Sequence, residues 1–274
     1  MIKINVLVEN TVISGDFKGK HGLCLYIETE KHKILFDLGQ TGLFVKNAEK
    51  LGVDIASIDT VVVSHGHIDH GGGLKYFLAL NNTAKIYVRK DAFDKHFIKV
   101  FGIKVNVGLD RNLKDNKQVV FADDLVVIDQ ELTLFSNVKS EGFVTKSNSA
   151  LYANIDGKIV QDDFSHEPNL IVNENGKTLL LSGCSHAGIV NILTKAEEVV
   201  GDKIDNVVGG FHLYNPPTKR YESAESIDSL AQVLAEKDSK FYTCHCTGEK
   251  AYSKMKSVLK DRLAYLSTGA EIEI

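Results

Sequence analysis

The sequence predicts a protein of mixed α and β structure (α/β, grading into α+β) that folds as one compact sandwich. β-Branched strands alternate with amphipathic helices in both halves of the 274-residue chain. No Pro- or Ser-rich linker separates the halves, so a single domain is expected over residues 1–274. A third observation is a dense cluster of histidines on a tight turn between a strand and a helix, at residues 65–70.

The first half of the chain is predicted to be rich in strands. These are expected at Ile2–Val8, Leu23–Glu28, Lys33–Gly39, Asp59–Ser64 and Lys85–Val88. A helix is expected over about residues 42–51, since Phe44 and Ala48 lie on one apolar face. Residues 74–80 form a second helix-like run. Residues 94–150 lack strong periodicity, and part of this region is expected to be an insertion or lid over the site.

The second half repeats this organisation. An Asn175-Gly176 turn between two apolar runs predicts a hairpin of residues 169–172 and 178–182. The other expected strands are Asn206–Gly210 and Lys240–Thr243, and the expected helices are Ala187–Val200, Ser226–Glu236 and Glu249–Leu259.

The composition excludes several classes of protein. A chain that is 43% hydrophobic and 25% charged is typical of a soluble globular protein. A net charge of −4 with mixed signs gives no basic stripe, so no nucleic-acid partner is expected. No apolar run reaches membrane-spanning length, and Met1–Val8 is too short for a signal peptide, so no membrane partner is expected. Four cysteines are too few for a disulfide scaffold, which indicates a reducing, cytoplasmic location.

The His-Gly-His-Ile-Asp-His sequence at residues 65–70 has the character of a metal site. His65, His67 and His70 each offer a ring nitrogen, and Asp69 offers a carboxylate oxygen. Such ligands suit Zn²⁺, with Mn²⁺ or Fe²⁺ as alternatives. One ion cannot use all four ligands from so short a turn without strain. Two ions about 3.5–4 Å apart can, with His65 and His67 on one and Asp69 and His70 on the other.

This hexapeptide after a strand resembles the signature of the metallo-β-lactamase superfamily, a four-layer αββα sandwich with a binuclear centre between its sheets. The preceding strand, which ends Phe36-Asp37-Leu38-Gly39, also fits. Further motifs resemble a subfamily that includes the archaeal dihydropterin-ribofuranosylaminobenzene-phosphate synthases. They are Lys20-His21-Gly22-Leu23, Gly183-Cys184-Ser185-His186-Ala187-Gly188-Ile189, Gly209-Gly210-Phe211-His212-Leu213 and His245-Cys246-Thr247-Gly248.

The resemblance implies the remaining metal ligands. His245 matches the last histidine of the superfamily and is assigned to the second ion. For the first ion, His166 has the spacing of the superfamily's third histidine, whereas His186 lies in the subfamily motif; His186 is slightly favoured and both stay candidates. Cys184 is either a bridging thiolate or a buried thiol. In a strand, Cys244 and Cys246 would face away from His245, so both are expected to be packing residues.

Other side chains are assigned more loosely. Asp37 is a candidate to hold a ligand histidine in one tautomer, with an ordinary turn aspartate as the alternative. His212 is expected to bind substrate or protonate a leaving group, with a structural histidine as the alternative. Ser185 and Thr247 precede helices, whose N-termini attract anions, and are expected to bind substrate. His32 and His96 lie among charged residues and are expected on the surface.

These assignments predict a metal-dependent hydrolase. A metal-activated hydroxide is expected to attack an ester, lactone, thioester or phosphodiester of a small anionic substrate, with Asp69 orienting the nucleophile. A synthase-like condensation is the second interpretation. A non-catalytic metal-binding module is less consistent with so complete a ligand cluster. A di-iron redox enzyme is disfavoured, since that branch of the superfamily has glutamate where His67 stands.

Overall fold

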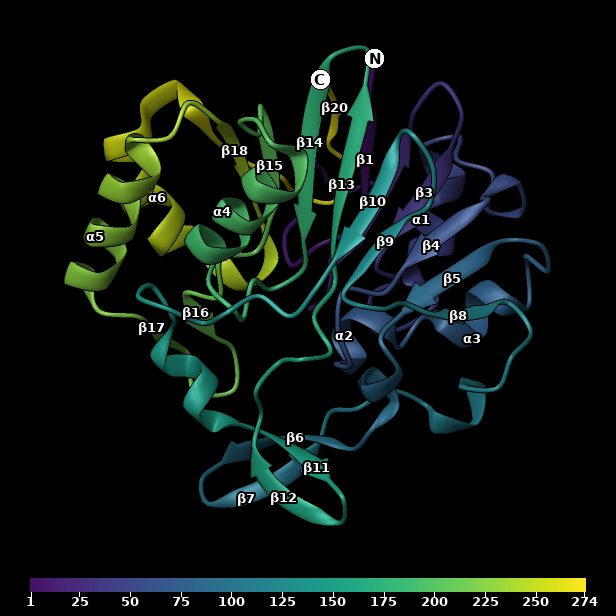
Figure 1. Ribbon diagram of the computed structural model, residues 1–274, viewed down its shortest axis with the longest axis horizontal. Helices are drawn as coiled ribbons and strands as arrows, with labels where there is room; N and C mark the ends of the chain where they lie inside the picture. The colour runs from purple at the N-terminus through teal and green to yellow at the C-terminus, as the bar shows by residue number, and fades with distance from the viewer.

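Two seven-stranded sheets face one another at the centre of the protein, and helices cover their outer faces (Figure 1). The computed structural model describes all residues from 1 to 274. The first sheet has the strand order β20-β1-β2-β3-β4-β5-β8. Its strands are β1 (Lys3–Val8), β2 (Cys24–Glu28), β3 (Lys33–Phe36), β4 (Thr60–Val62), β5 (Lys85–Val88), β8 (Val119–Phe121) and β20 (Glu271–Glu273).

The second sheet has the order β19-β18-β15-β14-β13-β10-β9. Its strands are β9 (Leu125–Val127), β10 (Leu132–Phe135), β13 (Asn169–Glu174), β14 (Lys177–Ser182), β15 (Asn206–Gly209), β18 (Lys240–Thr243) and β19 (Leu263–Tyr265). The main helices are α1 (Leu43–Lys50), α2 (Ile68–Gly71), α3 (Leu74–Leu78), α4 (Ile189–Val200), α5 (Ala224–Ala235) and α6 (Glu249–Leu259). None of the helices combines the length and apolar character needed to cross a bilayer.

The buried side chains form three layers, as a four-layer sandwich requires. Between the sheets, Phe36 and Leu25 of the first sheet share a cluster with Leu181 of the second. Phe44 of α1 packs on the outer face of the first sheet. Helices α4, α5 and α6 cover the outer face of the second, with Leu193 in that cluster. The expected αββα sandwich is therefore confirmed.

A separate four-stranded sheet, which we call the flap sheet, lies below the sandwich in Figure 1. It has the order β12-β11-β6-β7, from β6 (His96–Val100), β7 (Ile103–Asn106), β11 (Leu151–Ile155) and β12 (Lys158–Gln161). Residues 94–150, part of which is expected to be an insertion or lid, thus contribute strands to three different sheets. Only β6 and β7 from that region enter the flap sheet, while β8, β9 and β10 complete the two main sheets.

His32 connects the two main sheets and should make stability depend on pH. Its Nδ1 contacts Asp59 Oδ1 at 2.9 Å, just before β4, and its Nε2 contacts Asp129 Oδ2 at 2.6 Å, between β9 and β10. Partial burial lowers the pKa of His32, but hydrogen bonds to the two carboxylates outweigh this and raise it above 6.5. A raised pKa in the folded state means that the stabilisation is fully present below the unfolded-state pKa. It is lost as the pH rises through the folded-state value.

The melting temperature of the wild type should therefore exceed that of His32→Gln by about 1–3 °C at about pH 5.5, since the pair with Asp59 is half exposed. The difference should shrink as the pH rises toward about 9. Thermal unfolding of both proteins across this range measures it. Parallel curves would show that the two carboxylates do not hold a proton on His32.

Candidate metal centre

The candidate site lies where parallel strands of both sheets end. Side chains with metal-binding atoms follow β4, β14, β15 and β18, and the carboxyl ends of parallel strands meet at one edge of a sheet. The two edges touch at Gly183, where an added Cβ would lie only 2.1 Å from Ser64 Oγ. A larger residue would push the two strand ends apart, so this glycine lets the sheets share one site.

The backbone at these strand ends is strained. Of the eleven non-glycine residues with positive φ in the chain, four lie here: Asp37 (63°), Ser185 (57°), His212 (48°) and His245 (51°). Each such residue costs about 1–3 kcal/mol and persists only where the surroundings enforce it. Strain of this kind is common at functional sites, and these four residues surround one cluster of histidines.

Three imidazoles form what we call the first ligand group: His65, His67 and His186. Their ring centroids lie 4.6 Å (His65–His67), 4.9 Å (His65–His186) and 5.2 Å (His67–His186) apart. The Nε2 atoms of all three are buried without any hydrogen-bond partner. Burial lowers the pKa of His65 and His186 well below 6.5 and that of His67 to about 3. Neutral rings with unpartnered nitrogens fit a divalent cation.

Hydrogen bonds fix which nitrogen carries the proton in two of these rings, those of His65 and His186. Ser64 Oγ donates its only proton to Asp37 Oδ2 (2.7 Å), so it accepts from His65 Nδ1 (2.9 Å). Asn148 Oδ1 likewise accepts from His186 Nδ1 at 3.0 Å. Both histidines therefore direct an Nε2 lone pair into the centre.

Asp69, His70 and His245 form the second ligand group. His245 Nε2 lies 3.2 Å from His70 Nε2 and 3.3 Å from Asp69 Oδ2. Asp37 Oδ2 accepts from His70 Nδ1 at 2.6 Å, so the expected contact between Asp37 and a candidate ligand is present. Burial lowers the pKa of His70, but the charges of Asp37 and Asp69 raise it to about 9. The negative charge of these two carboxylates, which stabilises a proton on His70, would also stabilise a metal cation.

Cys184 lies between the two groups. Its Sγ is 3.2 Å from His70 Nε2 and belongs to compact sets of ligand atoms with both His65–His186 and His70–His245. The thiol is buried, and burial raises its pKa well above 9. Of the two interpretations of Cys184, its position fits a ligand shared by both groups, since the sulfur faces the histidines rather than the apolar core.

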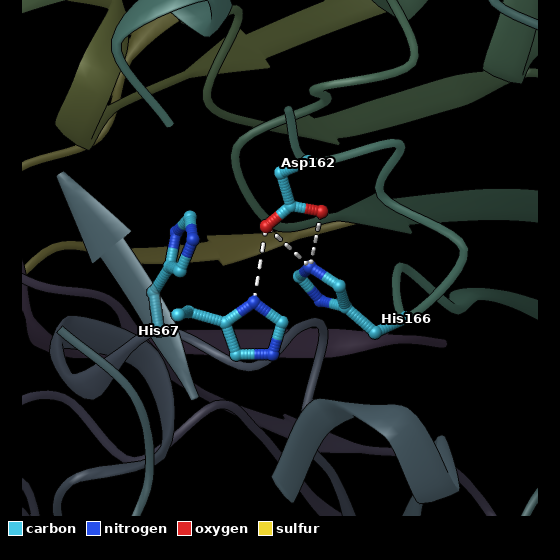
Figure 2. A group of neighbouring side chains, drawn as sticks. His67, Asp162 and His166 are labelled. Carbon is cyan, nitrogen blue, oxygen red and sulfur yellow. Dashed lines mark hydrogen bonds and ion pairs between the residues drawn. The ribbon is translucent and has the colours of Figure 1, made fainter. Parts of the chain in front are cut away.

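His166 lies beside this centre, in a different cluster (Figure 2). Its Nδ1 accepts from the Gly66 backbone N–H at 2.9 Å, and its Nε2 lies 3.2 Å from both oxygens of Asp162. Since Nε2 must then carry the proton, neither nitrogen has a free lone pair. The structure brings His186, not His166, to the first ligand group. The surface expectation for His96 is wrong: it is 1% exposed, because it pairs with buried Asp162.

A cavity of about 340 Å³ opens above the two groups. Its polar wall includes Asp69, Cys184 and His212, and its apolar wall includes Ile98 and Leu151 of the flap sheet. No Lys or Arg lines it. His212 is 8% exposed, and neither of its ring nitrogens has a hydrogen-bond partner. A buried unpartnered imidazole in a cavity wall is available to bind or protonate a ligand, rather than serving as a satisfied structural histidine.

Two expected substrate-binding hydroxyls do not reach this cavity. Ser185 Oγ donates to Ser182 Oγ at 2.9 Å, and Thr247 Oγ1 accepts from the Phe211 N–H at 2.8 Å. Both residues do precede helices, α4 and α6, but they are buried and absent from the lining. Their observed contacts stabilise the backbone of the surrounding turns, and no contact supports a direct role in substrate binding.

The two cysteines beside His245 have different surroundings. Cys244 packs between the sheets, as expected. The expectation for Cys246 is wrong: it lines the cavity, and its Sγ forms a compact set with Cys184 and His212. The strand ends at Thr243, and residues 245–247 form a 3-10 turn, so strand alternation no longer decides where the side chain points.

Several residues that sequence reasoning did not single out hold the ligands in place. Asn10 Oδ1 accepts from His245 Nδ1 at 3.1 Å, as Asn148 does for His186. Buried Glu167 accepts from the backbone N–H of His186 at 2.7 Å and of Ala187 at 3.0 Å. Isolated Asn and Glu residues carry no spacing signal, so only the folded structure identifies them.

The αββα layers and the histidine-rich strand ends define a metallo-β-lactamase-type protein, and comparison with known proteins agrees. The family model described as "Metallo-beta-lactamase superfamily" matches residues 18–149, which include the hexapeptide. The crystal structure of Tm1679, described as a metal-dependent hydrolase of the β-lactamase superfamily, aligns with a TM-score of 0.85 at 29% identity. That alignment covers 100% of this chain and 99% of Tm1679. The chain belongs to the metallo-β-lactamase superfamily.

Two curated relatives from Methanocaldococcus jannaschii match almost the whole chain. One is a 7,8-dihydropterin-6-methyl-4-(β-D-ribofuranosyl)-aminobenzene-5′-phosphate synthase, 31% identical over 99% of this chain and 96% of that protein. The other is the uncharacterized protein MJ0448, 29% identical over 93% of this chain and 94% of that protein. The resemblance to the synthase-containing subfamily is therefore confirmed.

Proposed function

We propose that the protein is a hydrolase with a binuclear metal centre that cleaves a small ester-type substrate. The observation that carries the proposal is the pair of ligand groups that share Cys184 beneath one cavity. His65, His67 and His186 would hold one divalent ion, and Asp69, His70 and His245 the other. The soft sulfur of Cys184 favours Zn²⁺ over Mn²⁺ or Fe²⁺. When bound, such ions lower the pKa of a water molecule and polarise the substrate.

The chain's own residues supply the remaining functions. Asp69 lies in the cavity wall, so its carboxylate can orient an attacking water. The contact between Asp69 Oδ2 and His21 Nε2, at 3.1 Å, holds that carboxylate in place. His212 can donate a proton to the leaving group, because its ring faces the cavity with both nitrogens unpartnered. Ile98 and Leu151 offer apolar contact to the remainder of the substrate and exclude water.

The cavity wall also bears on the substrate class. With no Lys or Arg in the lining, the ions would be the main source of positive charge in the cavity. This favours a substrate with a single negative charge next to an apolar group, for which a phosphodiester is the simplest example. The lactone, thioester and carboxylic ester classes share the same chemistry of attack and stay within the proposal.

A synthase-like condensation is the second candidate function. It is favoured by the 31% identity to the M. jannaschii synthase over nearly the full length of both proteins. One fold supports several reactions, so this identity makes the condensation a candidate but does not establish it.

The proposal is tested by metal analysis and a panel of probes. Purified protein loaded with Zn²⁺ should bind about two ions per chain. It should also turn over at least one of four probes: bis(p-nitrophenyl) phosphate, a chromogenic carboxylic ester, a lactone and a thioester. Removal of the ions by a chelator should abolish turnover, and Zn²⁺ should restore it. Two bound ions without turnover of any probe would favour the synthase-like alternative. Fewer than one ion per chain would contradict the metal centre.

A further inference from the structure

Three buried side chains next to the metal centre form a cluster that we call the clamp: His96, Asp162 and His166. They are 1%, 5% and 2% exposed. His96 is the first residue of β6 and Asp162 directly follows β12, both in the flap sheet, while His166 lies in the loop between β12 and β13. Figure 2 shows Asp162 and His166 beside His67 of the first ligand group.

The hydrogen bonds of the clamp use every ring nitrogen. His166 donates from Nε2 to Asp162, because its Nδ1 accepts from the Gly66 N–H. His96 Nε2 faces the carbonyl oxygen of Asp91 at 3.2 Å, and its Nδ1 faces Asp162 Oδ2 at 3.0 Å. Both of these partners are acceptors, so whichever nitrogen of His96 carries the proton has a partner for it. Together with His67, the ligand atoms of the clamp are close enough to hold an ion, but His166 has no free lone pair to bind one.

The clamp acts on the backbone between two candidate ligands. Gly66 separates His65 from His67, and it packs so closely on His96 that an added Cβ would lie 2.6 Å from His96 Nε2. The next residues are tied to the flap sheet as well. Ile68 N donates to Val107 O at 2.7 Å, and Val107 N donates to His96 O at 2.9 Å. The direction in which His65 and His67 point therefore depends on how the flap sheet is seated.

We propose that His166 is a positioning residue for the first metal ion and not one of its ligands. Through its Nδ1 it holds the Gly66 N–H, and through Asp162 and His96 it connects the turn carrying His65 and His67 to the flap sheet. The inference rests on the metal centre of the proposed function but not on any particular reaction. Removing groups that orient metal ligands costs about 10–100-fold in metal affinity, which sets the expected effect.

The test measures Zn²⁺ affinity by chelator competition, in which two binding steps are resolved. His166→Ala should weaken one step by about 10–100-fold and leave the other unchanged. His166→Asn should restore most of this loss, because its Oδ1 takes the place of Nδ1 and accepts from the Gly66 N–H. Asp162→Asn weakens the support of the same ring without a change of size, and it should weaken the same step if His166→Ala does not fold.

His32→Ala is the matched control. His32 also bridges two carboxylates, Asp59 and Asp129, but it lies outside the ligand groups and the cavity lining. It should lower the melting temperature and leave both affinities unchanged.

Three results would overturn the proposal. A fall in melting temperature in His166→Ala with both affinities unchanged would make the clamp merely structural. Equal loss in His166→Asn and His166→Ala would show that the bond to Gly66 is irrelevant. A third ion in the wild type that His166→Ala removes would make the clamp an ion site. Since affinity is read without any substrate, these outcomes are independent of whether the probes are hydrolysed.

Discussion

Replacing His186 by alanine is expected to leave one metal ion per chain and to lower turnover of the best probe by about 1,000-fold. The loss removes one of three neutral imidazoles whose buried Nε2 atoms lack any other partner. Two imidazoles alone hold an ion weakly, and an ion that stabilises transition-state charge is worth several kcal/mol. Each 1.36 kcal/mol changes the rate tenfold. Metal content after dialysis against buffered Zn²⁺ and the rate constant of the same sample measure both effects.

His166→Ala is the matched control for this result. In saturating Zn²⁺ it should keep two ions per chain, because His166 has no free lone pair to give. If His166→Ala lost a whole ion and His186→Ala kept both, the assignment of the third histidine would be reversed.

Replacing Cys184 by alanine should weaken the binding of both ions, since its sulfur is shared by the two ligand groups. Turnover should fall by about 100-fold or more. Cys184→Asp should recover a large part of the activity, because a carboxylate can also bridge two cations. It should also shift the metal preference from Zn²⁺ toward Mn²⁺, since a hard oxygen replaces a soft sulfur. Titration of the metal-free proteins with each ion, followed by rate measurement, provides the readout.

Cys244→Ala serves as the control for this substitution. Cys244 is also a buried thiol, but it packs between the sheets and lies outside the cavity. It should lower stability without changing metal content. Unchanged metal affinity and preference in Cys184→Ala and Cys184→Asp would make Cys184 a buried thiol with no role in ligation.

The main elements could be predicted because their signals are local. Strand β4, the hexapeptide and the Gly-rich turn form one continuous segment, so spacing alone places His65, His67 and Asp69 on a tight turn. The hairpin of β13 and β14 follows from Asn175-Gly176 in the same way. Where ligands and their context are adjacent in sequence, periodicity and residue type are sufficient.

Contacts between distant segments could not be predicted in this way. The choice between His166 and His186 depends on the Gly66 N–H, which lies 100 positions before His166 and occupies its lone pair. His96 has charged neighbours in sequence, and only the seating of β6 against Asp162 buries it. The expectation for Cys246 is wrong because the chain leaves the strand and turns at His245, where φ is 51°. Each of these outcomes is decided by tertiary packing rather than by local pattern.

The central claim is that two ions lie between the two ligand groups with Cys184 shared between them. Anomalous diffraction at the zinc absorption edge, from crystals grown with Zn²⁺, tests it most directly. We predict two peaks about 3.5–4 Å apart, one within bonding distance of His65, His67 and His186 and the other of Asp69, His70 and His245. A single peak at this site, or a peak ligated by His166 in place of His186, would contradict the account.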